Sequence, residues 1–202
     1  MKTTFTHISK NLVRATILCL IIVTMSCSGN NDDPASFPEQ NPLAEYLKNS
    51  GFDQTKIEIK NNSNLDFYEF GFSFRPTVKG KINAIVVKIP DEQPQMRVTL
   101  WDVSTKTVLK TENIDILAAG QEVTKVITPF VLEKDKEYMI TCNTNDWYFY
   151  QKTDRTDVIY PIIAGDIQIT GFGYNDGITQ IFPSIMKTDR YRGDISFKFQ
   201  QN

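Results

Sequence analysis

The feature that most constrains the fold is a strict alternation of aromatic residues near the middle of the chain. Within Phe67 to Phe74, every second residue from Tyr68 onward is aromatic, and the residues between them are Glu69, Gly71 and Ser73. Because successive side chains of a strand point to opposite faces, this pattern predicts a strand with one aromatic face buried in a core. The dipeptide Arg75-Pro76 is expected to end the strand.

The same two-residue period recurs along the rest of the chain. The further strand candidates are Gly80 to Pro90, Gln95 to Val103, Val108 to Ile116, Val123 to Leu132, Tyr138 to Cys142, Trp147 to Tyr150, Ile167 to Tyr174 and Ile195 to Phe199. Turn-rich segments separate these strand candidates, and no long helical pattern lies between them. We therefore predict an all-β fold, an antiparallel β-sandwich (jelly-roll or immunoglobulin-like) of about ten strands. A short helix is predicted from Pro42 to Gly51, with Pro at its start and Gly at its end.

The N-terminus has the pattern of a secretory signal. Three basic residues, and no acid, precede the apolar run Ala15 to Met25, whose 11 residues fall short of the roughly 20 that a membrane-spanning helix needs. Ser26 directly before Cys27 resembles a bacterial lipobox, although Thr24 stands where an aliphatic residue is usual. We expect residues 1–26 to be a lipoprotein signal peptide, and Cys27 to carry palmitate-like acyl chains that tether the chain to a membrane. A plain cleaved signal without lipid is the alternative.

The segment after Cys27 has little to bury. Residues 27–42 contain three Pro and the acidic pair Asp32 and Asp33, so we expect a flexible spacer, followed by a single domain from 43 to 202. Acids shortly after the lipidated Cys resemble the surface-export signal of Bacteroidetes-type lipoproteins. That resemblance implies a bacterial outer-membrane protein facing the cell exterior. The alternatives are the periplasmic side and an ordinary solvated linker.

Composition restricts the chemistry of the mature chain. The only histidine, His7, lies in the signal, so Ser-His-Asp and Cys-His catalysis and the usual catalytic zinc sites are excluded. From Cys27 onward there are 19 basic and 24 acidic residues, a net charge of −5 without a basic cluster, which argues against nucleic acid as a partner. If Cys27 is lipidated, Cys142 is the only free thiol, and no intramolecular disulfide can form. We expect no enzymatic activity; a histidine-free glycosidase with two facing carboxylates is the low-ranked alternative.

No motif indicates a cofactor. The acids near predicted loops, which are candidate oxygen ligands for a structural Ca²⁺, are Asp146, Asp154, Asp157, Asp166 and Asp176. They form no dense D-x-D-x-D-G loop, so we expect neither metal nor cofactor. Arg192-Gly193-Asp194 spells the integrin tripeptide, but it leads directly into the last predicted strand and receives little weight.

Three segments carry a resemblance to a known kind of protein. They are F-x-F-x-P-x-x-x-G-x-I from Phe72 to Ile82, VTLWD from Val98 to Asp102, and P-F-x-L-E-x-x-x-E-Y from Pro129 to Tyr138. Together they resemble a bacterial β-sandwich family of unknown function found in secreted and surface proteins, similar in outline to carbohydrate-binding jelly rolls. The resemblance spans about residues 67–152 and assigns no functional residue.

Three aromatic residues are candidate ligand contacts. Trp147 and Tyr148 follow a polar turn at the end of a predicted strand, and Tyr174 lies in a glycine-rich segment, where flat rings could stack on sugars. Core packing is the alternative for each. We expect a lipid-anchored, surface-exposed binding module for a glycan or another extracellular ligand. The alternative is a structural or adhesin-like interaction protein in a cell-surface assembly, which would bury its aromatic rings and expose an apolar edge.

Overall fold

The computed structural model describes residues 37–52, 58–61 and 67–202. Cys27, the predicted signal and most of the predicted spacer lie outside these residues. Within them, no helix has the length and apolar character needed to cross a membrane. The compact unit runs from Phe37 to Asn202.

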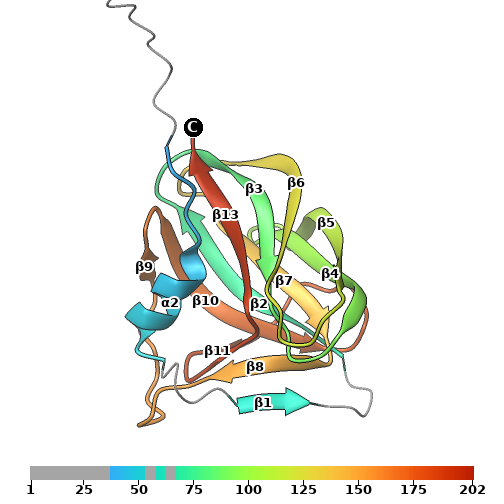
Figure 1. Ribbon diagram of the computed structural model, residues 1–202. Helices are drawn as coiled ribbons and strands as arrows, with labels where there is room; N and C mark the ends of the chain where they lie inside the picture. The colour runs from blue at the N-terminus through green and yellow to red at the C-terminus, as the bar shows by residue number, and fades with distance from the viewer. Residues whose placement is uncertain (1–36, 53–57, 62–66) are drawn as a thin grey trace, which may run out of the picture. The chain divides into compact units, whose positions relative to one another are not determined.

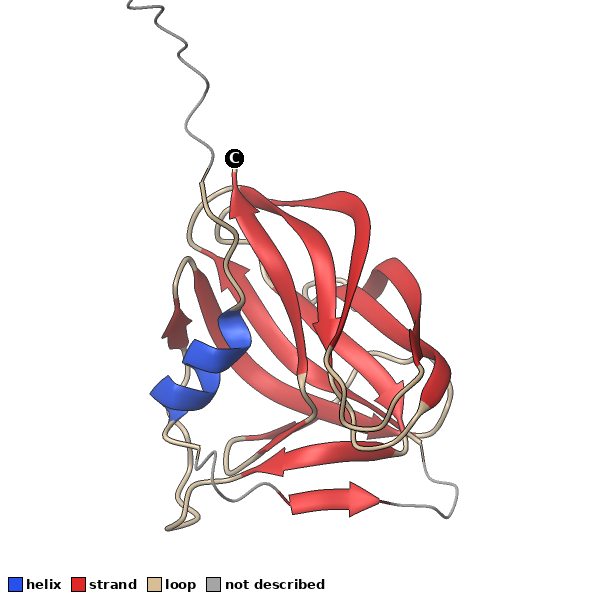
Figure 2. Cartoon of the chain, viewed as in Figure 1, coloured by secondary structure: helices blue, strands red, loops and turns tan. Residues whose placement is uncertain are grey.

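The one described helix is α2 (Pro42–Ser50), which confirms the sequence prediction. The Asn41 side chain caps it by accepting a hydrogen bond from the Leu43 amide at 3.3 Å, and Gly51 ends it in the left-handed conformation, with φ of 73°. The helix buries Tyr46 and Leu47 against the sheets. Figure 2 shows this helix in blue beside the red strands.

The largest sheet is antiparallel and has seven strands. Its strands are β2 (Tyr68–Pro76), β4 (Gln93–Asp102), β5 (Thr107–Ile116), β7 (Tyr138–Thr144), β9 (Ile162–Ala164), β10 (Ile167–Asp176) and β11 (Ile185–Lys187). They pair in the order β11-β10-β2-β7-β4-β5. The short strand β9 pairs with β10 on the edge of β10 that does not pair with β2. The aromatic strand β2 therefore lies in the middle of the sheet, between β10 and β7 (Figure 1).

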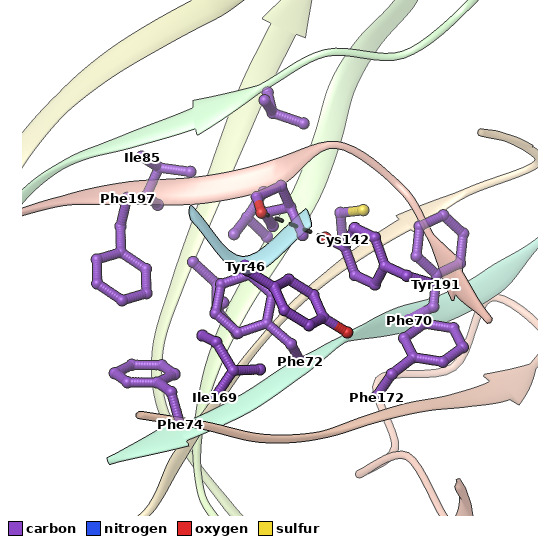
Figure 3. Close-up of a cluster of buried hydrophobic side chains, with 14 of the residues drawn as sticks. Tyr46, Phe70, Phe72, Phe74, Ile85, Cys142, Ile169, Phe172, Tyr191 and Phe197 are labelled. Atoms are coloured by element: carbon purple, nitrogen blue, oxygen red, sulfur yellow. Dashed lines mark hydrogen bonds between the residues drawn. The ribbon is translucent and has the colours of Figure 1, made fainter. Parts of the chain in front are cut away.

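A second antiparallel sheet packs against the aromatic face of the first. Its strands are β3 (Gly80–Val87), β6 (Val123–Leu132) and β13 (Ile195–Gln201), in the order β13-β3-β6. The Phe197 ring of β13 lies 4.7 Å from the Phe74 ring and 6.1 Å from the Phe72 ring. Tyr46 from α2 joins this cluster at 5.8 Å from Phe72 (Figure 3). This two-layer arrangement confirms the predicted all-β sandwich.

A third, short sheet adds further strands to the sandwich. It contains β1 (Glu58–Asn61), β8 (Asp146–Tyr150) and β12 (Tyr191–Arg192), with β8 in the centre. Tyr150 of β8 stacks on Tyr191 of β12 at 6.0 Å, and Trp147 meets Phe70 of β2 at 5.7 Å. In Figure 1, β8 runs below the strands of the other two sheets. The central strand β8 and the edge strand β12 of this short sheet connect to the core through aromatic side chains.

The end of the predicted spacer belongs to the compact unit. Gln40 forms a bridge with Phe199 of β13, and its side chain exchanges hydrogen bonds with Asp166 at 2.5 and 2.9 Å. Asn41 accepts a hydrogen bond from the Ser196 hydroxyl. Ordered contacts therefore begin at least three residues before Leu43.

Candidate functional site

Residues from four strands converge on one arginine where β8 and β12 meet the seven-stranded sheet. Arg192, the last residue of β12, places its guanidinium carbon 4.9 Å from the Tyr174 ring centre, 5.1 Å from that of Trp147 and 5.8 Å from that of Tyr68. The rings also contact one another, because Tyr68 meets Trp147 edge-on at 5.2 Å and Tyr174 at 6.4 Å. We call these four residues the Arg192 cage. Its contacts are cation–π interactions that hold the guanidinium in a fixed orientation.

Two hydrogen-bond donors in the cage have no acceptor. Both the indole Nε1 of Trp147 and the Nε of Arg192 are buried, and neither forms a hydrogen bond. A buried donor without a partner costs about 1–3 kcal/mol, so such groups are rare in native proteins. Burial lowers the pKa of Arg192 from its ordinary value, but an arginine side chain stays protonated at neutral pH. The cage therefore combines a fixed positive charge with unused N–H groups.

The structure brings together two of the three predicted ligand residues. Trp147 and Tyr174 both contact Arg192, whereas Tyr148 packs elsewhere, with the Lys88 ammonium 5.1 Å from its ring centre. Trp147 is 3% exposed and Tyr148 is 8% exposed, while Tyr174 is half-buried. None of the three offers an open aromatic platform of the kind that stacking on a sugar ring requires. Ligand binding by these residues stays a prediction. Because their rings are not open to solvent, such binding would depend on polar contacts.

Sequence reasoning did not select Arg192 as a site residue. Arg192 appeared only as the first member of Arg192-Gly193-Asp194. In the fold, the side chains of Arg192 and Asp194 lie in different clusters. Gly193 has φ of 98°, and a Cβ at this position would lie 2.6 Å from the Phe70 ring. Glycine is therefore required both for the turn and for the close approach of Phe70.

The Asp194 carboxyl enters a second polar cluster. It hydrogen bonds to the Tyr150 hydroxyl, and burial raises the pKa of Asp194 to about 6, although the Lys88 ammonium opposes this effect. Burial also raises the pKa of Tyr150. Asp146, only 2% exposed, likewise has its pKa raised to about 6 by burial and by the neighbouring Asp91 carboxyl.

Three of the four remaining loop acids have structural contacts, and the charge of the fourth, Asp176, acts on Arg192. Asp154 accepts hydrogen bonds from the Thr156 amide and hydroxyl, and Asp157 accepts one from Thr188. Asp166 binds Gln40 as described above. Within the described part of the chain, no three side chains of His, Cys, Asp or Glu are grouped so that they could hold a metal ion.

A polar network lies on the face of the large sheet that points away from the aromatic core. Glu69 of β2 is fully buried there and accepts hydrogen bonds from Arg97 at 2.6 Å and Thr141 at 2.5 Å. Trp101 is also buried on this outer face. Its indole donates to Thr141 at 2.8 Å, and its ring meets Phe182 of the β10–β11 loop edge-on at 5.8 Å. This network pairs the charges of Arg97 and Glu69 with each other, although the Nε of Arg97 is also buried without an acceptor.

Comparison of the sequence with protein-family models and with curated proteins gives no match, so the resemblance to surface β-sandwich lipoproteins stays a prediction.

Proposed function

We propose that this protein is a lipid-anchored binding module at the bacterial cell surface, and that it captures a glycan or another extracellular ligand at the Arg192 cage. One observation carries the choice of site: two buried N–H donors, on Trp147 and Arg192, have no acceptor although their side chains are in direct contact. A ligand oxygen at this position would remove a cost of about 1–3 kcal/mol for each donor.

The chemistry of the cage suits an oxygen-rich ligand. The three rings hold the guanidinium in place, so little side-chain freedom would be lost when a ligand binds. Because Trp147 is buried, recognition would rely on hydrogen bonds from the indole and guanidinium, with sugar carbons against the accessible parts of Tyr68 and Tyr174.

The anchor is part of the same proposal. The basic flank, the short apolar run and Ser26-Cys27 support lipidation at Cys27. Radiolabelled palmitate should enter the wild-type chain and should not enter Cys27→Ala. Incorporation that persists in the variant would rule out Cys27 as the anchor.

A glycan array probed with the full chain in detergent tests the binding function. Arg192→Gln should weaken any hit at least about tenfold, since it removes a charged hydrogen-bond donor. Arg155→Gln is the matched control, because Arg155 is an exposed arginine that is not among the groups acting on Arg192. Equal binding by wild type and Arg192→Gln would exclude the cage as the ligand site.

A second candidate function rests on a different surface. Four apolar side chains on β11 and the loop before it are exposed: Ile178 (67%), Ile181 (52%), Ile185 (38%) and Met186 (52%). Exposed apolar groups beside an edge strand are typical of interaction surfaces, which favours a structural or adhesin-like role in a surface assembly. Crosslinking on intact cells should then capture a partner with the wild type but not with Ile181→Ser/Met186→Ser.

A further inference from the structure

We propose that the Arg192 cage is specific for a carboxylate, the acid group of a uronic-acid-type saccharide, bound between the Arg192 guanidinium and the Trp147 indole N–H. This inference rests on the proposed function and narrows its ligand to an acidic one.

The first support is an arginine without a counterion. Three other described arginines each have a carboxylate within 2.5–2.7 Å: Arg75 pairs with Glu137, Arg97 with Glu69, and Arg190 with Asp189. Arg155 has no such partner, but it is exposed to solvent. Arg192 is partly buried, and its guanidinium forms no hydrogen bond or ion pair with a described residue, although the charge of Asp176 acts on it. Buried charges in proteins are nearly always paired, so the missing partner of Arg192 is an anion.

The second support is the identity of the unpaired nitrogen. In a guanidinium, Nε and one terminal nitrogen form an edge that matches the two oxygens of a carboxylate. Nε of Arg192 is buried and lacks an acceptor, as does Nε of Arg97, but Arg97 has Glu69 on a terminal nitrogen and Arg192 has no carboxylate at ion-pair distance among the described residues. Trp147 adds a third N–H from a ring 5.1 Å from the guanidinium carbon, and a carboxylate has enough lone pairs to accept all three hydrogen bonds.

The third support is the arrangement of the rings. Aromatic faces are electronegative and aromatic edges are electropositive, so an anion is repelled by the faces that attract a cation. The faces of Tyr68, Trp147 and Tyr174 are turned to the guanidinium, which leaves its edge and the indole N–H as the approach for an anion. A neutral hydroxyl could satisfy the donors, but it would leave the positive charge unpaired.

Titration calorimetry on the full chain in detergent, with saccharides of one length, separates charge from shape. The probes are an oligogalacturonate, its methyl ester, a neutral galactan oligosaccharide and a sulfated one. The free acid should bind at least about tenfold more tightly than the ester, because the ester keeps the ring and loses the charge. Arg192→Gln should remove this difference, whereas Arg155→Gln, at an exposed position, should change the affinity by less than about threefold.

A readout independent of affinity comes from the two tryptophans. The Trp101 indole already donates to Thr141, whereas the Trp147 indole has no acceptor. In a ¹⁵N-labelled sample, the acid should move the Trp147 indole N–H signal downfield and leave that of Trp101 in place, with Trp101→Phe used for assignment. This experiment does not require a substitution in the buried Trp147.

The outcomes distinguish the two levels of the proposal. Equal affinity for the acid and the ester, or a preference for the sulfated probe, would overturn the carboxylate assignment and leave the glycan-binding function standing. Absence of binding to every saccharide, both here and on the array, would overturn the glycan-binding function. An acid-specific complex in which the Trp147 signal does not move would place the ligand outside the cage.

Discussion

Replacing Arg97 should show that the outer-face network is essential for stability. Arg97→Met removes the cation that pairs with Glu69 at 2.6 Å and leaves a carboxylate that is 0% exposed with Thr141 as its remaining hydrogen-bond donor. Loss of one partner from a buried ion pair costs about 3–5 kcal/mol, because the other charge stays in a low-dielectric site. For a domain of this size, each kcal/mol lowers the Tm by about 2–4 °C, so the Tm should fall by roughly 6–20 °C.

Arg75→Met provides a matched control for this prediction. The Arg75–Glu137 pair has a similar separation, 2.7 Å, but the Arg75 side chain is 47% exposed. Such surface pairs contribute about 0–1 kcal/mol. Urea unfolding at neutral pH measures both variants. Adding Glu69→Gln to Arg97→Met should recover part of the loss, because it removes the unpaired charge. If Arg97→Met lowers the free energy of unfolding no more than Arg75→Met does, the view that the Arg97–Glu69 pair is buried and coupled is refuted.

Three further predictions follow from buried groups. The pKa values of Asp146 and Asp194 are raised from the ordinary 3.8 to about 6, so the folded state binds these protons more tightly than the unfolded state. The free energy of unfolding should therefore fall as the pH rises from about 4 to about 6, and urea midpoints at pH 5 and pH 7.5 should differ less in Asp194→Asn than in the wild type. A difference between the two urea midpoints that is as large in Asp194→Asn as in the wild type would contradict this prediction. Gly193→Ala should lower the Tm by several degrees, because φ is 98° and the added Cβ would meet the Phe70 ring, whereas Gly177→Ala, at a similar φ but in open space, should cost less. Phe72→Ala should cost about 3–5 kcal/mol in urea unfolding, since the ring is fully buried, and a loss under 1 kcal/mol would mean that the site collapses around the cavity.

The long strands could be predicted because their signal is local. Val123–Leu132 was predicted to the residue, and the alternation from Tyr68 to Phe74 correctly separated the core face of β2 from its outer face. Strands β9, β11 and β12 have only two or three residues, too few for a two-residue period to be recognised. Their positions are set by the partners they meet, β10 and β8, which is information that the local sequence does not contain.

The site was predicted less well because it is built from distant segments. Tyr68, Trp147, Tyr174 and Arg192 come from four strands, and nothing local to Arg192 indicates that three rings surround it. The choice of both Trp147 and Tyr148 also conflicted with strand geometry, since consecutive residues point to opposite faces. Strand periodicity alone would have allowed only one of them at a shared site.

The contrast between the two tryptophans gives the strongest reason to seek function at the Arg192 cage. Both are buried, at 2% for Trp101 and 3% for Trp147, so both indole N–H groups have lost water. The fold supplies Trp101 with Thr141 as an acceptor and supplies nothing to Trp147. With the unpaired Nε of Arg192, the cage carries a cost of about 2–6 kcal/mol, a large part of the roughly 5–15 kcal/mol that stabilises a typical domain. A chain that satisfies one tryptophan and leaves the other unpaired, beside an arginine that forms no ion pair with a described residue, has kept its free donors where an anionic ligand could use them.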